Sequence, residues 1–320
     1  MAAHTQSTRQ WAKVVDLNKC LGCQECSSVC KMWWTSREGA ECMWWAVVET
    51  RPGPGFPRDW PTETAKGRMP GAGDYGQAFD LQYARLQSGS GAEEVRILPD
   101  KELFFGPNWY GDVGEGIRPD DTWFFHLHLA CMHCTKPACV EACPNRAIYK
   151  RDDGIVLINQ ELCKGHKSCI LACPYKRIFW NSVQNCADKC HFCFPRLEEG
   201  KAPMCTAACT GRAIFAGDIK DKTSKVYKLV HEYKVGLPLH PEYGTQPNMY
   251  FIPPALSASV HDAKKLFADV IRVPEDYLQK LFGPDVRQAM HILRREREKV
   301  ASGKPSPLMD ILTAYPTWNI

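Results

Sequence analysis

Alternating apolar and polar residues between positions 144 and 162 predict a short helix followed by a β-hairpin. The segment PNRAIYKRDDGIVLINQEL contains one strand pattern at residues 147–150 and a second at residues 155–159. Between them, Asp-Asp-Gly at residues 152–154 is typical of a tight turn, since glycine accepts backbone conformations that other residues avoid. The hairpin lies between Cys143 and Cys163 and therefore connects two cysteine-containing loops.

Helical periodicity dominates beyond Pro254 and predicts two helices, at residues 274–282 and 284–300, each with a proline near its start. In the second helix Val286, Met290 and Leu293 share one face, while arginine and lysine cover most of the rest. A solvated basic face is the favoured interpretation, and binding of a partner or of anionic lipid is the alternative.

Residues 51–122 contain few strand patterns and are rich in glycine and proline. A loop of this length is usually functional or interfacial, so we expect an insertion that faces a partner subunit. No stretch is apolar and long enough to cross a membrane, and residues 1–13 have neither the apolar core nor the twin arginine of an export signal. We therefore expect no direct membrane span in this chain.

Cysteine is the outlying feature of the composition. The 320 residues include 17 cysteines, and an odd number leaves one thiol over in a complete disulfide framework. Disulfide scaffolds are also usually short secreted chains. The hydrophobic fraction of 44% is ordinary, and a net charge of +4 is too small to indicate nucleic-acid binding. The cysteines occur in tight groups, which is typical of metal–thiolate sites.

Four groups contain fifteen of the cysteines. Group one, residues 20–30, is C-x2-C-x2-C-x3-C, and group two, residues 131–143, is C-x2-C-x4-C-x3-C. Group three, residues 163–173, has the ferredoxin spacing but carries His166 where the second cysteine belongs, and group four, residues 190–209, is C-x2-C-x11-C-x3-C. Two-residue gaps let one loop hold three corners of a cubane cluster, and the x3 gap leads the chain away toward another cluster.

The last cysteine of each motif ligates the other cluster in two-cluster ferredoxins, so the motifs must come in pairs. The hairpin joins groups two and three, which both end in Cys-Pro, and this leaves groups one and four as the second pair. Exchange of the last cysteines then predicts four sites, numbered here 1 to 4. Site 1 is Cys20, Cys23, Cys26 and Cys209; site 2 is Cys30, Cys190, Cys193 and Cys205; site 3 is Cys131, Cys134, Cys139 and Cys173; site 4 is Cys143, Cys163 and Cys169.

Structural zinc is the alternative, because C-x2-C pairs also occur in zinc ribbons. Zinc sites combine two knuckles of two ligands rather than triplets followed by x3-C, which favours iron–sulfur clusters. Cys42 and Cys186 lie outside the groups, and we expect buried free thiols there. For His126, His128 and His133 beside group two, structural roles or hydrogen bonds toward cluster sulfurs are favoured over haem or metal ligation.

Five stretches carry a family resemblance: VVDLNKCLGCQECSSVCK (14–31), MWWAVVETRPGPGFPRDW (43–60), HCTKPACVEACPNRAIYKRDDGIVL (133–157), CHFCFPRLEEGKAP (190–203) and GLPLHPEYGTQPNMYFIPP (236–254). With the four nested motifs, they resemble the beta, electron-transfer subunits of type II molybdoenzymes of the dimethyl sulfoxide reductase family. That branch contains nitrate reductase, nitrite oxidoreductase, perchlorate, chlorate and selenate reductases, and ethylbenzene and dimethylsulfide dehydrogenases. The resemblance covers about residues 10–255 and is weakest across the insertion.

The resemblance bears directly on site 4. In this branch the position of His166 commonly holds a residue that is not a ligand, and the site holds a 3Fe-4S cluster, because a corner iron without a protein ligand is labile. We therefore expect three 4Fe-4S clusters at sites 1 to 3 and one 3Fe-4S cluster at site 4. Ligation of a fourth iron by His166 is the alternative, since imidazole binds iron in Rieske centres.

The resemblance also implies an electron relay of anaerobic respiration. A catalytic alpha subunit with a molybdopterin cofactor would face site 1, and a haem b gamma subunit or a membrane anchor would face site 4. The alternative is a beta subunit of the formate dehydrogenase or polysulfide reductase type. Co-export with the alpha subunit implies a periplasmic location, with the cytoplasmic face of the membrane as the alternative.

The chain shows no nucleotide-binding glycine loop and no nucleophile–base pair, so we expect a non-catalytic electron-transfer subunit. The predicted fold class is α+β, with two pseudo-repeats that each resemble a two-cluster bacterial ferredoxin. Residues 1–50 and 180–255 would form the first, around groups one and four, and residues 123–180 the second, around groups two and three. The loop-rich insertion at 51–122 and a helical C-terminal extension at 256–320 complete the chain.

Overall fold

The computed structural model describes residues 9–52, 124–255 and 273–318. The chain forms two compact units, and the first comprises Met1–Arg51, Phe125–Leu256 and Val273–Ile320. All described residues except Pro52 and Phe124 belong to this first unit. The predicted insertion at 51–122 lies outside the described residues apart from its first two positions.

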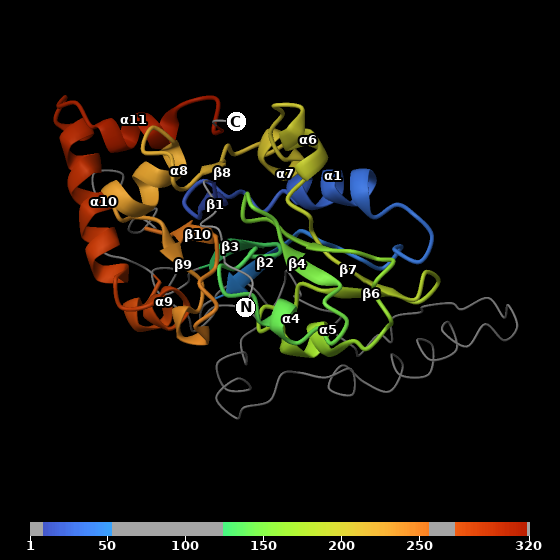
Figure 1. The fold of residues 1–320 in the computed structure, drawn as a ribbon. Helices are drawn as coiled ribbons and strands as arrows, with labels where there is room; N and C mark the ends of the chain where they lie inside the picture. The colour runs from blue at the N-terminus through green and yellow to red at the C-terminus, as the bar shows by residue number, and fades with distance from the viewer. Residues whose placement is uncertain (1–8, 53–123, 256–272, 319–320) are drawn as a thin grey trace, which may run out of the picture. The chain divides into compact units, whose positions relative to one another are not determined.

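A four-stranded mixed sheet organises the first unit (Figure 1). Its strands lie in the order β8 (Ile214–Asp218), β1 (Trp11–Asp16), β10 (Met249–Ile252) and β9 (Leu237–Pro238). β1 runs antiparallel to β8 and parallel to β10, and all six of its residues are buried. Such burial is expected of an inner strand that is covered on both faces.

Smaller elements surround this sheet. In the described residues the two-stranded sheets are β2 (Val47–Pro52) with β3 (Phe124–Leu129), β4 (Ile148–Lys150) with β5 (Val156–Ile158), and β6 (Phe179–Asn181) with β7 (Cys186–Asp188). The helices near the cysteine groups are α1 (Glu25–Trp34), α4 (Ala138–Glu141), α5 (Ser168–Ala172), α6 (Phe194–Glu198) and α7 (Met204–Ala207). Of these, α1 packs against α7 and α4 packs against α5.

The side chains of β1 alternate between the two faces of the sheet, as the geometry of a strand requires. Ala12 and Val14 pack into a core with Phe215 of β8 and with residues from the C-terminal helices. Trp11 lies in a second core, where it meets Phe192. Lys13 shares the face of Trp11, since its Nζ lies 4.4 Å from the centroid of the Phe192 ring.

The predicted hairpin is confirmed, because β4 pairs antiparallel with β5 and Ile148 lies opposite Ile158. The predicted short helix before it is wrong: residues 144–146 form a turn, in which the N–H of Arg146 donates to the carbonyl of Cys143. Arg146 has a left-handed backbone (φ 52°), which a helix does not accommodate, and only four residues separate the cysteine from β4.

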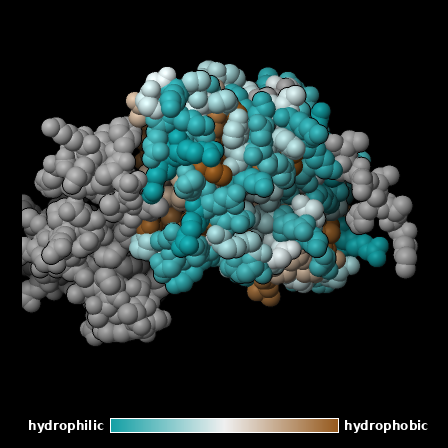
Figure 2. Space-filling view, turned by 90° about the vertical axis from the view of Figure 1, so that its left-hand side faces the viewer, coloured by the Kyte–Doolittle hydropathy of each residue, from teal (hydrophilic) through white to brown (hydrophobic). Residues whose placement is uncertain are grey.

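Both predicted C-terminal helices are present, as α9 (Glu275–Phe282) and α10 (Val286–Ala301), and α11 (Pro307–Thr313) follows them. Val286, Met290 and Leu293 are buried along one face of α10, as the periodicity predicts. Residues of α8 (Lys225–Tyr227), of the π-helix at Lys228–Glu232, and of α10 and α11 pack into the core on the Ala12 and Val14 face of the main sheet. Phe282 of α9 contacts Phe251 of β10 instead, on the other face. The side of the chain that carries α10 is predominantly hydrophilic (Figure 2), in keeping with a solvated basic face.

Candidate metal-cluster sites

The four cysteine loops share one backbone feature. The residue before the second ligand position has a left-handed conformation in every group: Gly22 (φ 68°), His133 (φ 43°), Gly165 (φ 77°) and Phe192 (φ 59°). A left-handed residue between two cysteines tightens the loop so that both side chains leave it on the same side. His166 therefore projects from the same loop geometry as Cys23, and the third group is a true member of the set.

Site 1 forms at the start of α1 and just beyond α7. Its four cysteines line one pocket together with Val48 and His128. Burial raises the pKa of the Cys20 thiol, and the nearby thiolates of Cys209 and Cys23 raise it further. Cys209, the last cysteine of group four, has thus joined the first three cysteines of group one.

Site 2 is the most enclosed of the four, because every one of its cysteines is buried. Burial raises the pKa of Cys30, and the thiolates of Cys190, Cys205 and Cys193 add to this rise. Burial and Cys205 likewise raise the pKa of Cys193 to about 12. Thiols in such a place ionise only when a cation or a metal centre stabilises the thiolates.

Site 3 joins three cysteines of group two to the last cysteine of group three. Burial and the Cys131 thiolate raise the pKa of Cys139 to about 12, and Cys173 and Cys134 contribute to the same rise. Burial also raises the pKa of Cys134 to about 12, although a hydrogen bond from Thr245 opposes the rise. All four cysteines of this site are half-buried.

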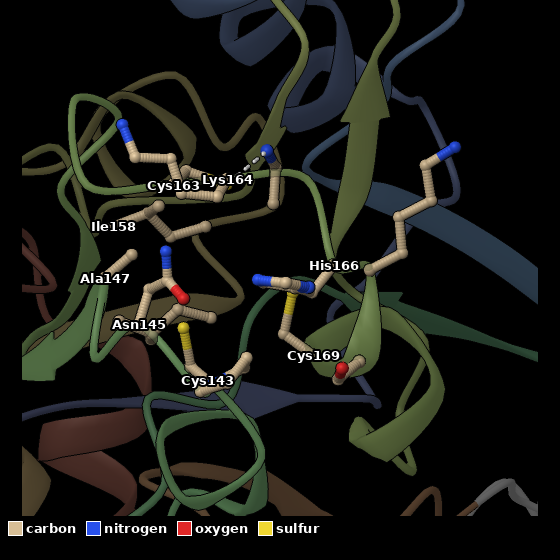
Figure 3. Close-up of a pocket in the computed structure, with 13 residues that line it drawn as sticks. Cys143, Asn145, Ala147, Ile158, Cys163, Lys164, His166 and Cys169 are labelled. Atoms are coloured by element: carbon tan, nitrogen blue, oxygen red, sulfur yellow. Dashed lines mark hydrogen bonds between the residues drawn. The ribbon is translucent and has the colours of Figure 1, made fainter.

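Site 4 is an open pocket of about 340 Å³, with Cys143, Cys163 and Cys169 in its lining. Figure 3 shows the ring of His166 in the same cavity, beside Cys169 and on the side opposite Cys143. His166 is exposed, and Lys164 and Lys167 lie next to it in the rim. The pocket therefore has three sulfurs and one solvent-facing imidazole where site 1 has four sulfurs.

The structure brings together cysteines that the spacing assigns to the same site: one pocket is lined by the four of site 1 and another by the three of site 4, and thiols within site 2 and within site 3 act on one another's pKa. Their assignment as cluster ligands stays a prediction. Backbone amides point at several of the sulfurs: the N–H groups of Ala213, Phe192 and Ala187 donate to the sulfurs at positions 209, 190 and 163, at 3.2, 3.4 and 3.5 Å respectively. Hydrogen bonds of this kind stabilise the thiolates of an iron–sulfur cluster and help to set its potential.

The spacing of these side chains fits a multi-iron cluster better than a single ion. Among the residues that the structure describes, no three His, Cys, Asp or Glu side chains converge closely enough to hold one metal ion. A zinc ion would need its sulfurs at about 2.3 Å from one centre. The four cysteines of site 1 instead line a pocket of about 330 Å³, as a cubane with an iron at each corner requires.

Two cysteines remain outside the sites. Cys186 is a buried thiol, as predicted, with its sulfur 3.9 Å from the side-chain oxygen of Gln184. The prediction of burial is wrong for Cys42, which is exposed. It lies in the irregular turn between α1 and β2, where no sheet or helix covers it.

The histidines beside group two have different surroundings. His128 is buried, and its Nδ1 lies 3.3 Å from the sulfur of Cys26, so a hydrogen bond toward site 1 is confirmed for this residue. Burial lowers the pKa of His128 to about 3, which keeps the ring neutral. His133 has a structural role instead, since its Nδ1 accepts a hydrogen bond from the N–H of Val156 at 3.1 Å. His126 is half-buried and contacts Thr50.

Lys13 is a site residue that sequence reasoning missed. Its Nζ donates to the sulfur of Cys205 at 3.1 Å in site 2. Burial disfavours the charged form of this lysine, but the thiolates of Cys205, Cys190 and Cys193 outweigh burial and raise its pKa. The sequence feature that could have indicated this role is the lysine in the middle of the apolar run WAKVV, seven residues before the first ligand.

Known proteins match this chain over most of its length. Residues 122–219 match the family model of a 4Fe-4S dicluster domain. The chain is 47% identical to the perchlorate reductase beta subunit of Dechloromonas aromatica, over 95% of this chain and 93% of that protein. It is 41% identical to the selenate reductase beta subunit of Thauera selenatis, over 97% of each, and 31% identical to the respiratory nitrate reductase 1 beta chain of Escherichia coli, over 89% and 79%.

An iron–sulfur protein with ferredoxin-type cysteine loops is the class that the fold and the sites define. The chain belongs to the beta subunits of the type II dimethyl sulfoxide reductase family of molybdoenzymes. It is accordingly an iron–sulfur electron-transfer subunit of an oxidoreductase. Nothing in these comparisons favours the formate dehydrogenase or polysulfide reductase type.

Proposed function

We propose that this subunit relays electrons through four clusters in the order site 1, site 2, site 3, site 4. This order rests on pairs of cysteines that stand four residues apart and belong to neighbouring sites. Cys26 of site 1 and Cys30 of site 2 both lie on α1, about 6 Å apart along the helix axis. In the pairs that connect sites 3 and 4, Cys139 lies on α4 and Cys169 on α5, while Cys143 and Cys173 follow the ends of these helices.

Sites 1 and 2 form one half of the relay and sites 3 and 4 the other, and the two halves meet between site 2 and site 3. The Cys131 thiolate of site 3 contributes to the raised pKa of Cys190 in site 2, after burial and against the effect of Lys13. Lys189, adjacent to Cys190 in the sequence, similarly acts on the pKa of Cys139. Contact between the halves makes a continuous series of sites. Each half corresponds to one ferredoxin-like pseudo-repeat, in which a pair of packed helices, α1 with α7 or α4 with α5, lies beside the cysteines.

For the cofactors, we propose three 4Fe-4S clusters and one 3Fe-4S cluster. Site 1 is held by Cys20, Cys23, Cys26 and Cys209, site 2 by Cys30, Cys190, Cys193 and Cys205, and site 3 by Cys131, Cys134, Cys139 and Cys173. The clusters supply one-electron transfer without substrate chemistry. At site 4 the corner without a thiolate is the one that faces solvent, beside the exposed His166, which favours loss of that iron.

Metal analysis of the purified complex tests this assignment. We expect about fifteen iron atoms per chain, together with an oxidised-state EPR signal from a 3Fe-4S cluster that disappears on reduction. A few zinc ions and no iron would overturn the proposed function. A sixteenth iron, with no 3Fe-4S signal and with Mössbauer evidence for a nitrogen-ligated iron, would instead assign His166 as a ligand and overturn only the cluster type.

For the partners, we propose a molybdopterin-containing alpha subunit at site 1 and a haem b gamma subunit or a membrane anchor at site 4. Large apolar side chains are exposed near each terminal site: Leu21 lines the site 1 pocket, Met32 and Trp33 lie further along α1, and Leu162 and Leu171 stand next to Cys163 and between Cys169 and Cys173. Exposed apolar residues of this kind are typical of surfaces that a partner covers. Cross-linking from positions 33 and 171 should capture two different subunits. Capture of one subunit by both positions would contradict the placement of the alpha subunit at site 1 and of a second partner at site 4.

For the location, we propose the periplasm, reached by co-export with the alpha subunit. In the parts of the chain that the structure describes, no helix has the length and apolar character to cross a membrane. Fractionation of intact cells, followed by protease treatment of spheroplasts, tests the location. Protection of the chain until the inner membrane is opened would place it at the cytoplasmic face instead.

A further inference from the structure

Lys13 occupies a position where a lysine is rarely found. It lies in the middle of β1, with Ala216 of β8 opposite on one side and Met249 of β10 on the other, and only 3% of its surface is exposed. Lysine is almost never buried to this degree unless an opposite charge is near. The groups that surround its ammonium therefore reveal what it does.

Within the described parts of the chain, no Asp or Glu forms an ion pair with Lys13. Its ammonium has two close neighbours, the sulfur of Cys205 at 3.1 Å and the ring of Phe192, whose centroid is 4.4 Å away. The cysteines of site 2 are therefore the anions that balance this charge. The other fully buried lysine of the region, Lys189, differs because its Nζ donates to the carbonyl oxygens of Val156 and Cys190 and to no sulfur.

A cation held against a cluster ligand acts on the cluster's reduction potential. Reduction adds one electron, supplied in the relay by a neighbouring cluster, and it makes the cluster and its thiolates more negative by one charge. A positive charge and an N–H···S hydrogen bond stabilise that extra negative charge, and they do so more strongly in a buried site of low dielectric. A hydrogen-bond donor on a ligand sulfur thus raises the reduction potential of one cluster relative to the potentials of the others.

Site 1 has a different side chain beside a ligand sulfur. There the Nδ1 of His128, whose ring is neutral, lies 3.3 Å from the sulfur of Cys26. An ammonium forms a stronger hydrogen bond than an uncharged donor and also contributes a net charge. Two adjacent clusters of the same type, joined by α1 and α7, therefore experience different electrostatic surroundings.

We propose that Lys13 is a potential-setting residue that raises the reduction potential of the cluster at site 2 through its hydrogen bond to Cys205 and its buried positive charge. The proposal rests on the proposed function, since it requires a cluster at site 2. It assigns Lys13 a role in tuning, not in ligation, because the ammonium has no free electron pair to offer to iron.

Redox titration of the intact complex by EPR, at one fixed pH, tests the proposal with the variants Lys13→Met, Lys13→Gln and Lys13→Arg. In Lys13→Met we expect the midpoint potential of one 4Fe-4S cluster to fall by about 59 mV or more, which is a tenfold or greater change in its one-electron equilibrium. The other midpoints and the iron content should remain those of the wild type. Lys13→Gln should show a smaller shift, and Lys13→Arg should retain a potential near that of the wild type because it keeps the charge.

The matched control is Lys225→Met. Lys225 lies on α8, on the opposite side of the sheet, and its Nζ donates to the carbonyl oxygen of Pro316. We expect no change in any midpoint for this variant. Unchanged midpoints in Lys13→Met or Lys13→Gln, with all clusters present, would overturn the proposal.

The experiment distinguishes a failure of the role proposed for Lys13 from a failure of the proposed electron-transfer function. If Lys13→Met does not assemble, the difference between Lys13→Gln and Lys13→Arg decides the question, because the two differ in charge: equal midpoints in these two variants overturn the proposal. Absence of iron–sulfur signals in the wild-type complex would overturn the proposed function itself.

Discussion

Site 2 and site 4 are built on the same type of loop but differ in what surrounds the ligands. All four cysteines of site 2 are buried, whereas at site 4 only Cys169 is buried and the second ligand position is the exposed His166. The residue before that position is left-handed in both loops, as Phe192 and as Gly165. The comparison teaches that one loop backbone can present four enclosed sulfurs at one site and three sulfurs with an exposed imidazole at another.

The largest effect should come from removing a ligand of the enclosed site. We expect Cys205→Ser to lose the cluster of site 2, about four irons per chain, and to interrupt electron flow between sites 1 and 3. Iron analysis and reduction of the distal clusters by the catalytic partner measure the effect. Cys186→Ser is the control, because Cys186 is also buried but belongs to no site. Equal iron content in the two variants would refute the assignment of Cys205.

A smaller and opposite effect should follow from completing the open site. We expect His166→Cys to gain one iron, to lose the 3Fe-4S signal and to convert site 4 into a 4Fe-4S site, because the new thiol leaves the loop as Cys23 does in site 1. EPR and iron analysis measure both changes. The companion variant His166→Ala should keep the 3Fe-4S signal and the iron content of the wild type. A 3Fe-4S signal that appears in this variant but not in the wild type would show that the imidazole holds the fourth iron.

The smallest effect should come from the loop backbone at site 4. Gly165→Ala places a Cβ on a left-handed residue (φ 77°) and 3.1 Å from the ring of Trp180. We expect a loss of about 1–2 kcal/mol from the backbone conformation, with an additional decrease in site 4 occupancy. Gly200→Ala provides the control, since Gly200 is also left-handed (φ 68°) but has no atom within 4 Å of the added carbon. Thermal denaturation should show similar losses in both, and only Gly165→Ala should weaken the 3Fe-4S signal.

The cysteine arrangement was predictable because it follows from local geometry. Two-residue gaps and the x3 step limit which sulfurs can meet, so the proximity of Cys209 to Cys20 could be predicted although the two residues are 189 positions apart in the sequence. The hairpin between groups two and three and helix α10 were predictable for the same reason, since each is encoded in a continuous stretch with a clear period.

Features that depend on distant pairing were not predictable. The parallel alignment of Lys13 with Met249 joins segments that are far apart in the sequence, and no local sequence pattern predicts this pairing. Lys13 was missed because a lysine within a strand pattern ordinarily indicates a solvent-facing or edge position, and its burial depends on β8, β10 and site 2 being assembled around it. Cys42 was wrongly assigned to the interior because free cysteines are usually buried and its irregular surroundings carry no period.

The short helix α1, which carries Cys26 for site 1 and Cys30 for site 2, has a consequence for maturation. A cluster inserted at either site fixes the helix that presents the ligand of the other, and Cys205 on α7 is likewise followed, four residues later, by Cys209 of site 1. Filling of one site should therefore favour filling of the other during maturation. The same helix that shortens the path for electrons also couples the delivery of the two clusters.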